Sequence, residues 1–207
     1  MAAANRAADG VFINCPFDAD YWPLLEVLVF TSLACGFAPR TALEVIDGGE
    51  VRIAKLKRIM GDCRFGIHDI SRVQPDPKYH LPRFNMPFEL GMDIGCRYFG
   101  DGRQRQKKIL ILDQDQYRYQ KYLSDIAGQD IKAHNNNPNR LFHAVRDWLR
   151  SSSRRKDIPG DLHIAKWFAE FSAALPELCN DSGLDRNNLA YVDYVMFARD
   201  WIDTLYT

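Results

Sequence analysis

The fold is decided by the stretch Val11-Phe-Ile-Asn-Cys-Pro-Phe17, in which a short apolar run leads into a turn. Residues 21–36 follow with apolar positions at helical spacing, and they end at Gly36, a residue type that commonly terminates helices. This pattern predicts a β-strand followed by an α-helix.

Further strands and helices alternate along the chain. We expect strands within residues 38–46, 64–70, 108–112 and 131–134, and helices over 51–60, 86–99, 119–127 and 140–150. Alternating strands and helices indicate a mainly parallel sheet with helices on both faces. We therefore predict an α/β fold, a flavodoxin-like doubly wound parallel five-stranded sheet of order 2-1-3-4-5, with a C-terminal helical extension.

The chain divides into an α/β domain at 1–150, a linker at 151–160 and the helical extension at 161–207. The extension contains two helices, over 162–175 and 190–205, which carry the aromatic residues Trp167, Phe168, Phe171, Tyr194, Phe197 and Trp201. Aromatic stripes of this kind usually belong to a core or an interface. The helices should pack together and against either the sheet domain or a second copy, and we favour a homodimer because the linker gives them reach.

The composition excludes several classes of partner. Lys+Arg and Asp+Glu both number 27, so the chain lacks the basic footprint of a nucleic-acid binder. The longest apolar stretch, 24–35, is shorter than the roughly 20 residues of a membrane span. Five cysteines without a C-x-x-C pair argue against a structural zinc site, and their odd number without a secretory leader favours the cytoplasm.

One carboxylate stands out in the stretch Leu81-Pro-Arg-Phe-Asn-Met-Pro-Phe-Glu-Leu-Gly91. Pro87 suits the first turn of a helix, which places Glu89 about two residues into a helix that opens near Met86. Glu89 should face the preceding loop and whatever that loop holds. Alternatively, Glu89 only complements the positive end of the helix dipole, a contribution of about 0.3–1 kcal/mol.

Polar residues follow the predicted strands at the edge where such sheets bind ligands. The first strand ends in Asn14-Cys-Pro-Phe17 and the third in Asp69-Ile-Ser-Arg72. Asp69 could instead be a helix cap or a turn former. Arg72 and Arg83 could hold a phosphate, or they could simply be solvated. His68 is expected to be a buried core histidine.

Three motifs carry a family resemblance. Phe88-Glu-Leu-Gly91 resembles a helix start of the nucleoside 2-deoxyribosyltransferases, and Ile67-His-Asp-Ile-Ser71 is similar to their strand that ends in a sugar-contacting aspartate. Phe12-Ile-Asn-Cys-Pro-Phe17 resembles the opening strand of that family and of the related Toll/interleukin-1 receptor (TIR) and SLOG-type folds. The resemblance covers residues 11–150.

The resemblance implies roles for individual residues. Glu89 would attack or stabilise the anomeric carbon as an N-glycosidic bond breaks, which is chemistry that carboxylates perform. Asp69 would bind a ribose hydroxyl, and the remaining substrate-binding residues would be Asn14, Phe17, Ser71, Arg72, Arg83 and Asn85. The loop 83–87 is bulkier than the family's glycine-rich loop, which points away from deoxyribosyl transfer itself.

The leading hypothesis is therefore an enzyme that cleaves the N-glycosidic bond of a nucleotide or of NAD, with NAD as a substrate and no cofactor or metal. By analogy with TIR-domain NAD hydrolases, it would be a bacterial defence effector. The main alternative is a non-catalytic nucleotide-sensing or interaction module of the same fold. A third reading makes the C-terminal helices a dimerisation element without any ligand.

Overall fold

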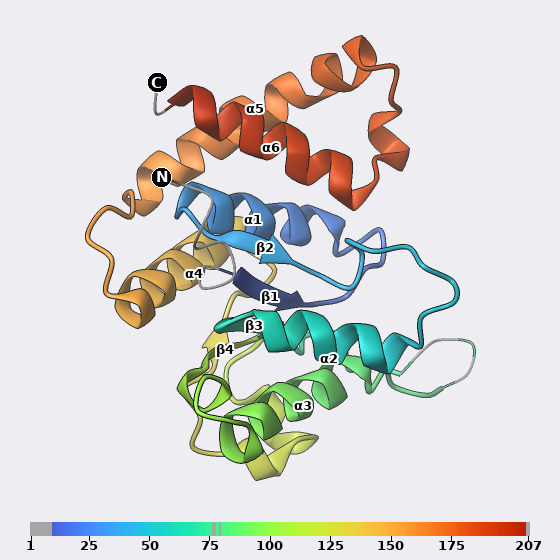
Figure 1. Ribbon diagram of the computed structural model, residues 1–207, viewed down its shortest axis with the longest axis vertical. Coiled ribbons are helices and arrows are strands. Elements are labelled where there is room, and N and C mark those ends of the chain that lie inside the picture. Colours follow the sequence, from blue (N-terminus) through green and yellow to red (C-terminus); the bar gives the residue numbers. More distant parts are fainter. Residues whose placement is uncertain (1–9, 76–77, 79, 206–207) are drawn as a thin grey trace.

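The computed structural model describes residues 10–75, 78 and 80–205. Its centre is an all-parallel sheet in the order β2-β1-β3-β4-β5 (Figure 1). The strands are β1 (Gly10–Asn14), β2 (Ala38–Arg40), β3 (Phe65–Asp69), β4 (Lys108–Asp113) and β5 (Lys132–Ala133). The predicted flavodoxin-like sheet and its strand order are confirmed.

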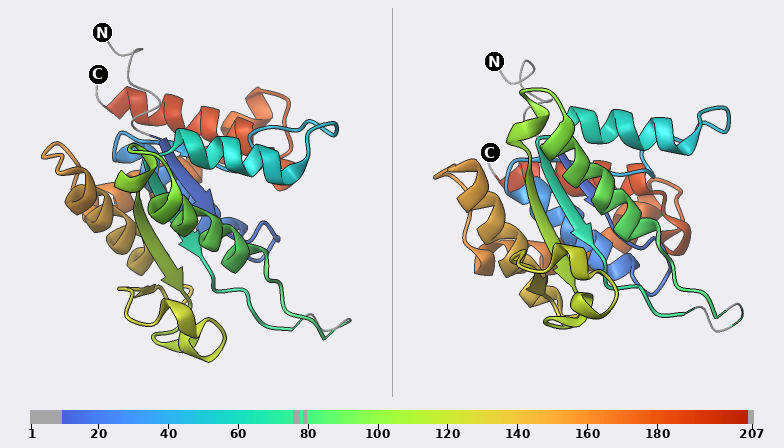
Figure 2. Two further views of the ribbon diagram at one scale, coloured as in Figure 1. Left: turned by 60° about the horizontal axis from the view of Figure 1, so that its bottom comes forward. Right: turned by 90° about the horizontal axis from the view of Figure 1, so that it is seen from below.

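Helices cover both faces of this sheet (Figures 1 and 2). One face carries α1 (Trp22–Ala34) and α4 (Pro138–Ser153), and the other carries α2 (Arg52–Asp62) and α3 (Asn85–Phe99). Successive side chains of a strand point to opposite faces. Accordingly, Val11 and Ile13 join the core beneath α1 and α4, whereas Phe12 packs with Leu56 and Ile59 of α2.

The two outer strands are shorter than the sequence suggests. Only Ala38–Arg40 of the region 38–46 pairs with β1, and only Lys132–Ala133 of the region 131–134 pairs with β4. β2 contains Pro39. A proline has no backbone N–H to give to a neighbouring strand, so it suits an edge strand better than a central one.

The predicted helix over 119–127 is wrong. Two short 3-10 helices replace it, η2 (Arg118–Lys121) and η3 (Ser124–Ile126). A helix of nine residues is only marginally stable without tertiary contacts. Here the tertiary contacts are polar side-chain interactions, and they favour a different conformation. The Tyr122 hydroxyl donates to Asp113 Oδ2 over 2.9 Å, and Arg118 pairs with the other oxygen of the same carboxylate, which holds the chain in tighter turns.

A third layer consists of α5 (Asp161–Asp181), the short η4 (Arg186–Asn188) and α6 (Tyr191–Leu205), which lie over α1 (Figure 1). The Phe171 ring of α5 stacks on Phe30 of α1, with 5.4 Å between ring centroids, and contacts Tyr194 of α6 at 5.7 Å. The aromatic faces are therefore buried against the sheet domain, one of the two expected possibilities. Most residues of α1 are apolar and buried, because the sheet and α4 cover one side of the helix and α5 and α6 cover the other.

The linker also needs correction, because α4 continues through Ser153 and only residues 154–160 connect it to α5. This segment is held against the α/β domain. The Arg155 guanidinium donates to the Gly36 carbonyl over 3.0 Å, and Ile158 is buried in the core that the sheet and the C-terminal helices share. Gly36 itself has φ +76°, as expected for a residue that ends α1.

None of the helices within residues 10–205 that the structure describes is long and apolar enough to cross a membrane. In the same part of the chain, no three His, Cys, Asp or Glu side chains are grouped so that they could hold a metal ion. The five cysteines are free thiols.

Candidate functional site

A cleft of about 440 Å³ opens where β1 ends and where α2 and α3 begin. It contains five residues that the sequence nominates, namely Asn14, Phe17, Arg83, Asn85 and Glu89. Its remaining lining residues are Cys15, Asp18, Arg52 and Met86. The structure therefore brings the first-strand residues and the α3 carboxylate together at the expected edge of the sheet.

Glu89 lies in the second turn of α3, because the helix begins at Asn85 rather than near Met86. The first turn contains no acidic residue. A helix dipole acts on charges mainly within the first turn, so its positive end gives only a weak reason for a carboxylate at position 89. The position instead directs Glu89 into the cleft.

The Glu89 side chain is almost buried, with the residue 5% exposed. Burial raises its pKa above the ordinary value of 4.5, and the positive charge of Arg52 offsets part of this rise. Arg52 Nη2 lies 3.3 Å from Glu89 Oε1 and approaches from the start of α2. Glu89 is thus a weakly compensated carboxylate that faces open space, an environment typical of reactive acids.

The neighbouring Cys15 thiol is a poor candidate for a nucleophile. Burial raises its pKa well above 9.0, and the negative charges of Asp69 and Glu89 raise it further. Because the thiolate is the reactive form of cysteine, Cys15 stays unreactive at neutral pH.

Arginines surround the mouth of the cleft. Asp18 lies between two of them, with Arg72 Nη2 at 3.6 Å and Arg83 Nη1 at 3.5 Å from its two carboxylate oxygens. Arg83 and Arg52 line the cleft with about half of each side chain exposed, whereas Arg72 does not line it. Guanidinium groups at the start of a helix form a suitable environment for a phosphate.

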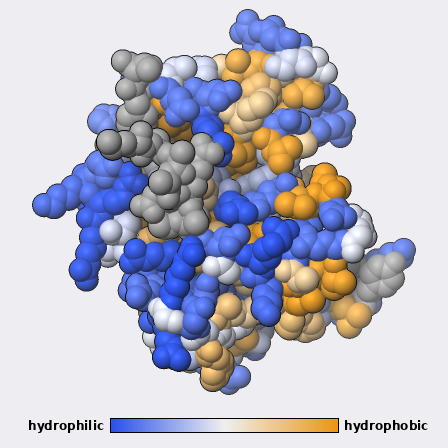
Figure 3. Space-filling model, viewed as in Figure 1, coloured by the Kyte–Doolittle hydropathy of each residue, from blue (hydrophilic) through white to orange (hydrophobic). Residues whose placement is uncertain are grey.

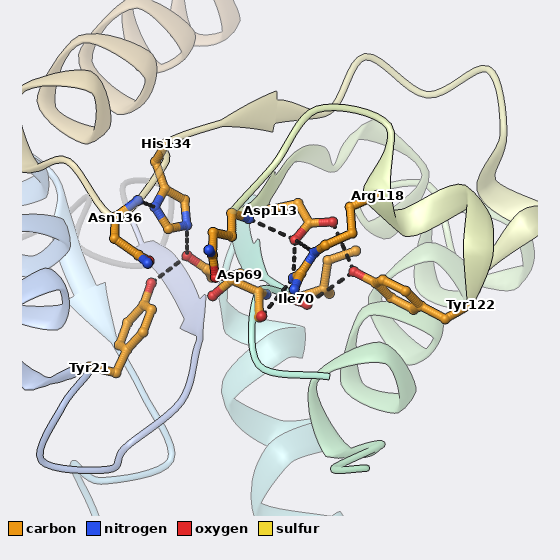
Figure 4. A network of polar contacts seen from close by, with 10 residues as sticks. Tyr21, Asp69, Ile70, Asp113, Arg118, Tyr122, His134 and Asn136 are labelled. Carbon is orange, nitrogen blue, oxygen red and sulfur yellow. Dashed lines mark hydrogen bonds and ion pairs between the residues drawn. The ribbon is translucent and has the colours of Figure 1, made fainter. Parts of the chain in front are cut away.

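Asp69 lies outside the cleft, in a closed polar network (Figure 4). The residue is fully buried. Its Oδ2 accepts a hydrogen bond from the Tyr21 hydroxyl and lies 3.0 Å from His134 Nε2, while its Oδ1 accepts from the Ser71 N–H over 2.8 Å. The Asn136 N–H donates to His134 Nδ1, so the ring proton is on Nε2 and faces Asp69.

This environment changes the role expected for Asp69. Burial alone would raise its pKa, but hydrogen bonds from His134, Ser71 and Tyr21 lower it below the ordinary value of 3.8. With these donors in place and no exposed surface, the side chain does not reach a sugar in the cleft. The structure supports the alternative role, since Asp69 forms a turn with the Ser71 N–H, and the ribose contact stays a prediction.

Ser71 belongs to the same closed region rather than to the cleft. It is buried, and its backbone carbonyl accepts a hydrogen bond of 2.6 Å from Arg118. The substrate contact of Ser71 likewise stays a prediction, because Ser71 does not line the cleft.

His68 is confirmed as a buried core histidine. Its Nδ1 lies 3.0 Å from Asn14 Nδ2, and its Nε2 lies 3.0 Å from Asp93 Oδ2. His68 thereby connects a residue of the cleft to the interior of α3.

Arg52 is the most important residue that the sequence reasoning missed. It follows the turn 47–49 and opens α2, the helix that comes after β2. The rule that ligands bind beyond the carboxyl ends of parallel strands applies to β2 as it does to β1 and β3. Applied to the second strand as well, that rule would have nominated Arg52.

Exposed apolar side chains lie beside the cleft. Leu81, Phe84 and Phe88, from the loop before α3 and from its first turn, are each at least 60% exposed. In the space-filling view, hydrophobic residues gather on the side of the molecule where the strands end (Figure 3). Base rings stack well on such aromatic surfaces.

Comparisons of the chain with protein-family models, with curated proteins and with solved structures gave no match.

Proposed function

We propose that this protein cleaves the N-glycosidic bond of a nucleotide or of NAD, with Glu89 as the catalytic carboxylate. One observation carries the proposal: Glu89 is nearly buried at an open cleft with a raised pKa, whereas its neighbours Asp69 and Cys15 are closed off or protonated. Among these groups, Glu89 is the one placed to react.

The proposed reaction follows from carboxylate chemistry. A Glu89 oxygen bonds to the anomeric carbon as the carbon–nitrogen bond breaks, and the base leaves with the bonding electron pair. Water then hydrolyses the glycosyl ester and restores the carboxylate. Arg52, 3.3 Å away, favours the ionised form that the first step needs.

The arginines support a phosphorylated substrate rather than a free nucleoside. Arg52 and Arg83 line the cleft, and α3 begins there at Asn85. The guanidinium groups and the positive end of the helix would both attract a phosphate. The partner proposed here is thus a small-molecule nucleotide.

A non-catalytic nucleotide sensor is the second candidate, and the ion pair between Arg52 and Glu89 favours it. A phosphate that draws Arg52 away from Glu89 would move the start of α2, and such a movement could signal binding without turnover. The two candidates differ in whether a product forms.

The test is to incubate the purified protein with nucleosides, nucleotides and NAD and to measure released base by chromatography. The enzyme hypothesis expects release from at least one phosphorylated compound, and loss of that release in Glu89→Gln. Binding without release from any compound would favour the sensor.

The wider setting is also a proposal: a bacterial defence effector that acts in the cytoplasm as a homodimer. The large aromatic faces are used within the chain, so a dimer would use the apolar residues left exposed on α5 and α6, which are Leu162, Val192 and Met196. Light scattering on the full-length chain measures the mass that decides this point.

A further inference from the structure

A series of buried polar side chains leads from the cleft into the molecule. It consists of Asn14 on β1, His68 on β3, Asp93 on α3 and Lys107 just before β4. Four buried polar side chains in contact lower the stability of the fold unless each donor faces an acceptor. This pairing of donors with acceptors determines the direction of each hydrogen bond.

The direction is set at the inner end. Lys107 Nζ lies 2.9 Å from Asp93 Oδ1 and also donates to the carbonyls of Met60 and Cys63 over 2.7 Å. Burial alone would raise the pKa of Asp93, but hydrogen bonding and charge from His68 and Lys107 lower it. An ionised Asp93 only accepts hydrogen bonds, so the ring proton of His68 is on Nε2, which faces Asp93 Oδ2 at 3.0 Å.

That tautomer sets the orientation of the Asn14 amide. With the proton on Nε2, His68 Nδ1 is an acceptor and receives one hydrogen of Asn14 Nδ2 over 3.0 Å. The other hydrogen goes to the Met86 carbonyl over 2.9 Å. Both amide hydrogens are used inside the protein, and Oδ1 is the polar atom of Asn14 left for a ligand in the cleft.

The sheet leaves space for this series at Gly66. A Cβ at this position would lie 2.3 Å from Asp93 Oδ2 and 3.0 Å from His68 Nε2. Gly66 lies within β3, where glycine weakens a strand and often marks a close approach. Any larger residue would displace the contact between His68 and Asp93.

We propose that the cleft recognises a hydroxyl group of a phosphorylated sugar through Asn14 Oδ1, and that His68, Asp93 and Lys107 are positioning residues that fix this oxygen. Asn14 Oδ1, together with Glu89 in the ionised form that the proposed reaction needs, offers acceptor oxygens in the cleft, which suits the hydroxyl donors of a sugar. The arginines at the mouth suit its phosphate. This inference rests on the proposed function, because it takes the cleft as the substrate site.

The test uses ribose 5-phosphate and inorganic phosphate as probes, titrated into the full chain by calorimetry. Wild-type protein should bind ribose 5-phosphate more tightly than phosphate. His68→Leu removes the acceptor for Asn14 and should weaken ribose 5-phosphate binding by about three- to tenfold while phosphate binding stays the same. His68→Asn keeps an acceptor near the Nδ1 position and should retain most of the affinity.

Nitrogen NMR of the wild-type His68 ring checks the cause independently, and it decides the matter if His68→Leu does not fold. A bare Nδ1 and a protonated Nε2 are expected. The proposal is overturned by the opposite tautomer, by equal wild-type affinity for the two probes, or by equal weakening of both in a folded His68→Leu. None of these measurements needs turnover, so a failure to release base would reject the proposed reaction separately.

Discussion

Two buried carboxylates at the same edge of the sheet differ in almost every respect. Asp69 is closed from the cleft, and its oxygens face Tyr21, Ser71 and His134, which keep its pKa low (Figure 4). Glu89 faces the cleft, has Arg52 at 3.3 Å, and has a raised pKa. A position at the end of a strand is therefore not enough to identify a reactive acid. The number of hydrogen-bond donors around each carboxylate distinguishes Asp69, which has a structural role, from Glu89, which is available for chemistry.

The two carboxylates also affect the stability of the fold in opposite directions. The ionised form of Asp69 is favoured in the folded protein, so its charge stabilises the fold. The ionised form of Glu89 is disfavoured there, so its charge opposes folding. A site that holds a destabilised charge ready for a ligand is a common property of functional clefts.

The largest effect is expected for Glu89→Gln, which keeps the shape and removes the charge. If Glu89 attacks the anomeric carbon, turnover should fall by orders of magnitude, as measured by base release. The free energy of unfolding should change by no more than about 1 kcal/mol, because only a partly exposed ion pair with Arg52 is lost. The matched control is Glu177→Gln on the exposed face of α5, which should leave turnover unchanged. Full base release by folded Glu89→Gln protein would refute the assignment.

Asp69→Ala should have the opposite pattern of effects, with its largest effect on the free energy of unfolding. Removing the carboxylate leaves buried donors of Tyr21 and His134 without an acceptor, at a cost of about 3–5 kcal/mol in unfolding free energy. Urea denaturation measures this loss. A variant that keeps the stability of the wild type but loses ligand affinity would instead support the predicted sugar role for Asp69.

A comparably destabilised control separates the two effects. Phe171→Ala removes a fully buried ring that contacts α1 and α6 and does not line the cleft, and it should also cost about 3–5 kcal/mol. Under conditions where both variants are folded, Phe171→Ala should bind ribose 5-phosphate as the wild type does. If it binds as weakly as Asp69→Ala, the loss in both reflects stability alone.

The sequence predicts the sheet well because each strand carries its own signal. The run of apolar residues in β4 and the glycine that ends α1 are local features, and the alternation of strands and helices predicts a parallel sheet, whose order 2-1-3-4-5 is one of the common orders for such sheets. The helix expected over 119–127 failed because side chains of Arg118 and Tyr122 are drawn to Asp113, a tertiary contact that local periodicity does not reveal.

The site was only partly predictable for the same reason. Glu89 and Asn14 follow from their places at a helix start and a strand end, which are local signals. Whether Asp69 is open or closed depends on Tyr21 and His134, which lie far from it in sequence and meet it only in the folded sheet. Arg52 likewise reaches Glu89 only because α2 and α3 lie side by side.

The smallest and most selective effect is expected in the pH dependence of stability. Well below pH 4.5, the ordinary pKa of a glutamate, Glu89 is protonated in both folded and unfolded chains and its burial has no electrostatic cost. As the pH rises from 4.5 through the raised folded pKa, the unfolded chain releases this proton first, so the wild type loses stability that Glu89→Gln keeps.

Asp69 acts with the opposite sign, since its stabilisation is lost as the pH falls through its lowered pKa, but it does so equally in both proteins. The difference in unfolding free energy, wild type minus Glu89→Gln, therefore isolates Glu89 and should decrease across this window and then level off. Urea denaturation of both proteins at a series of pH values measures it, and a difference that stays constant or increases would show that the Glu89 carboxylate is not held against its charge.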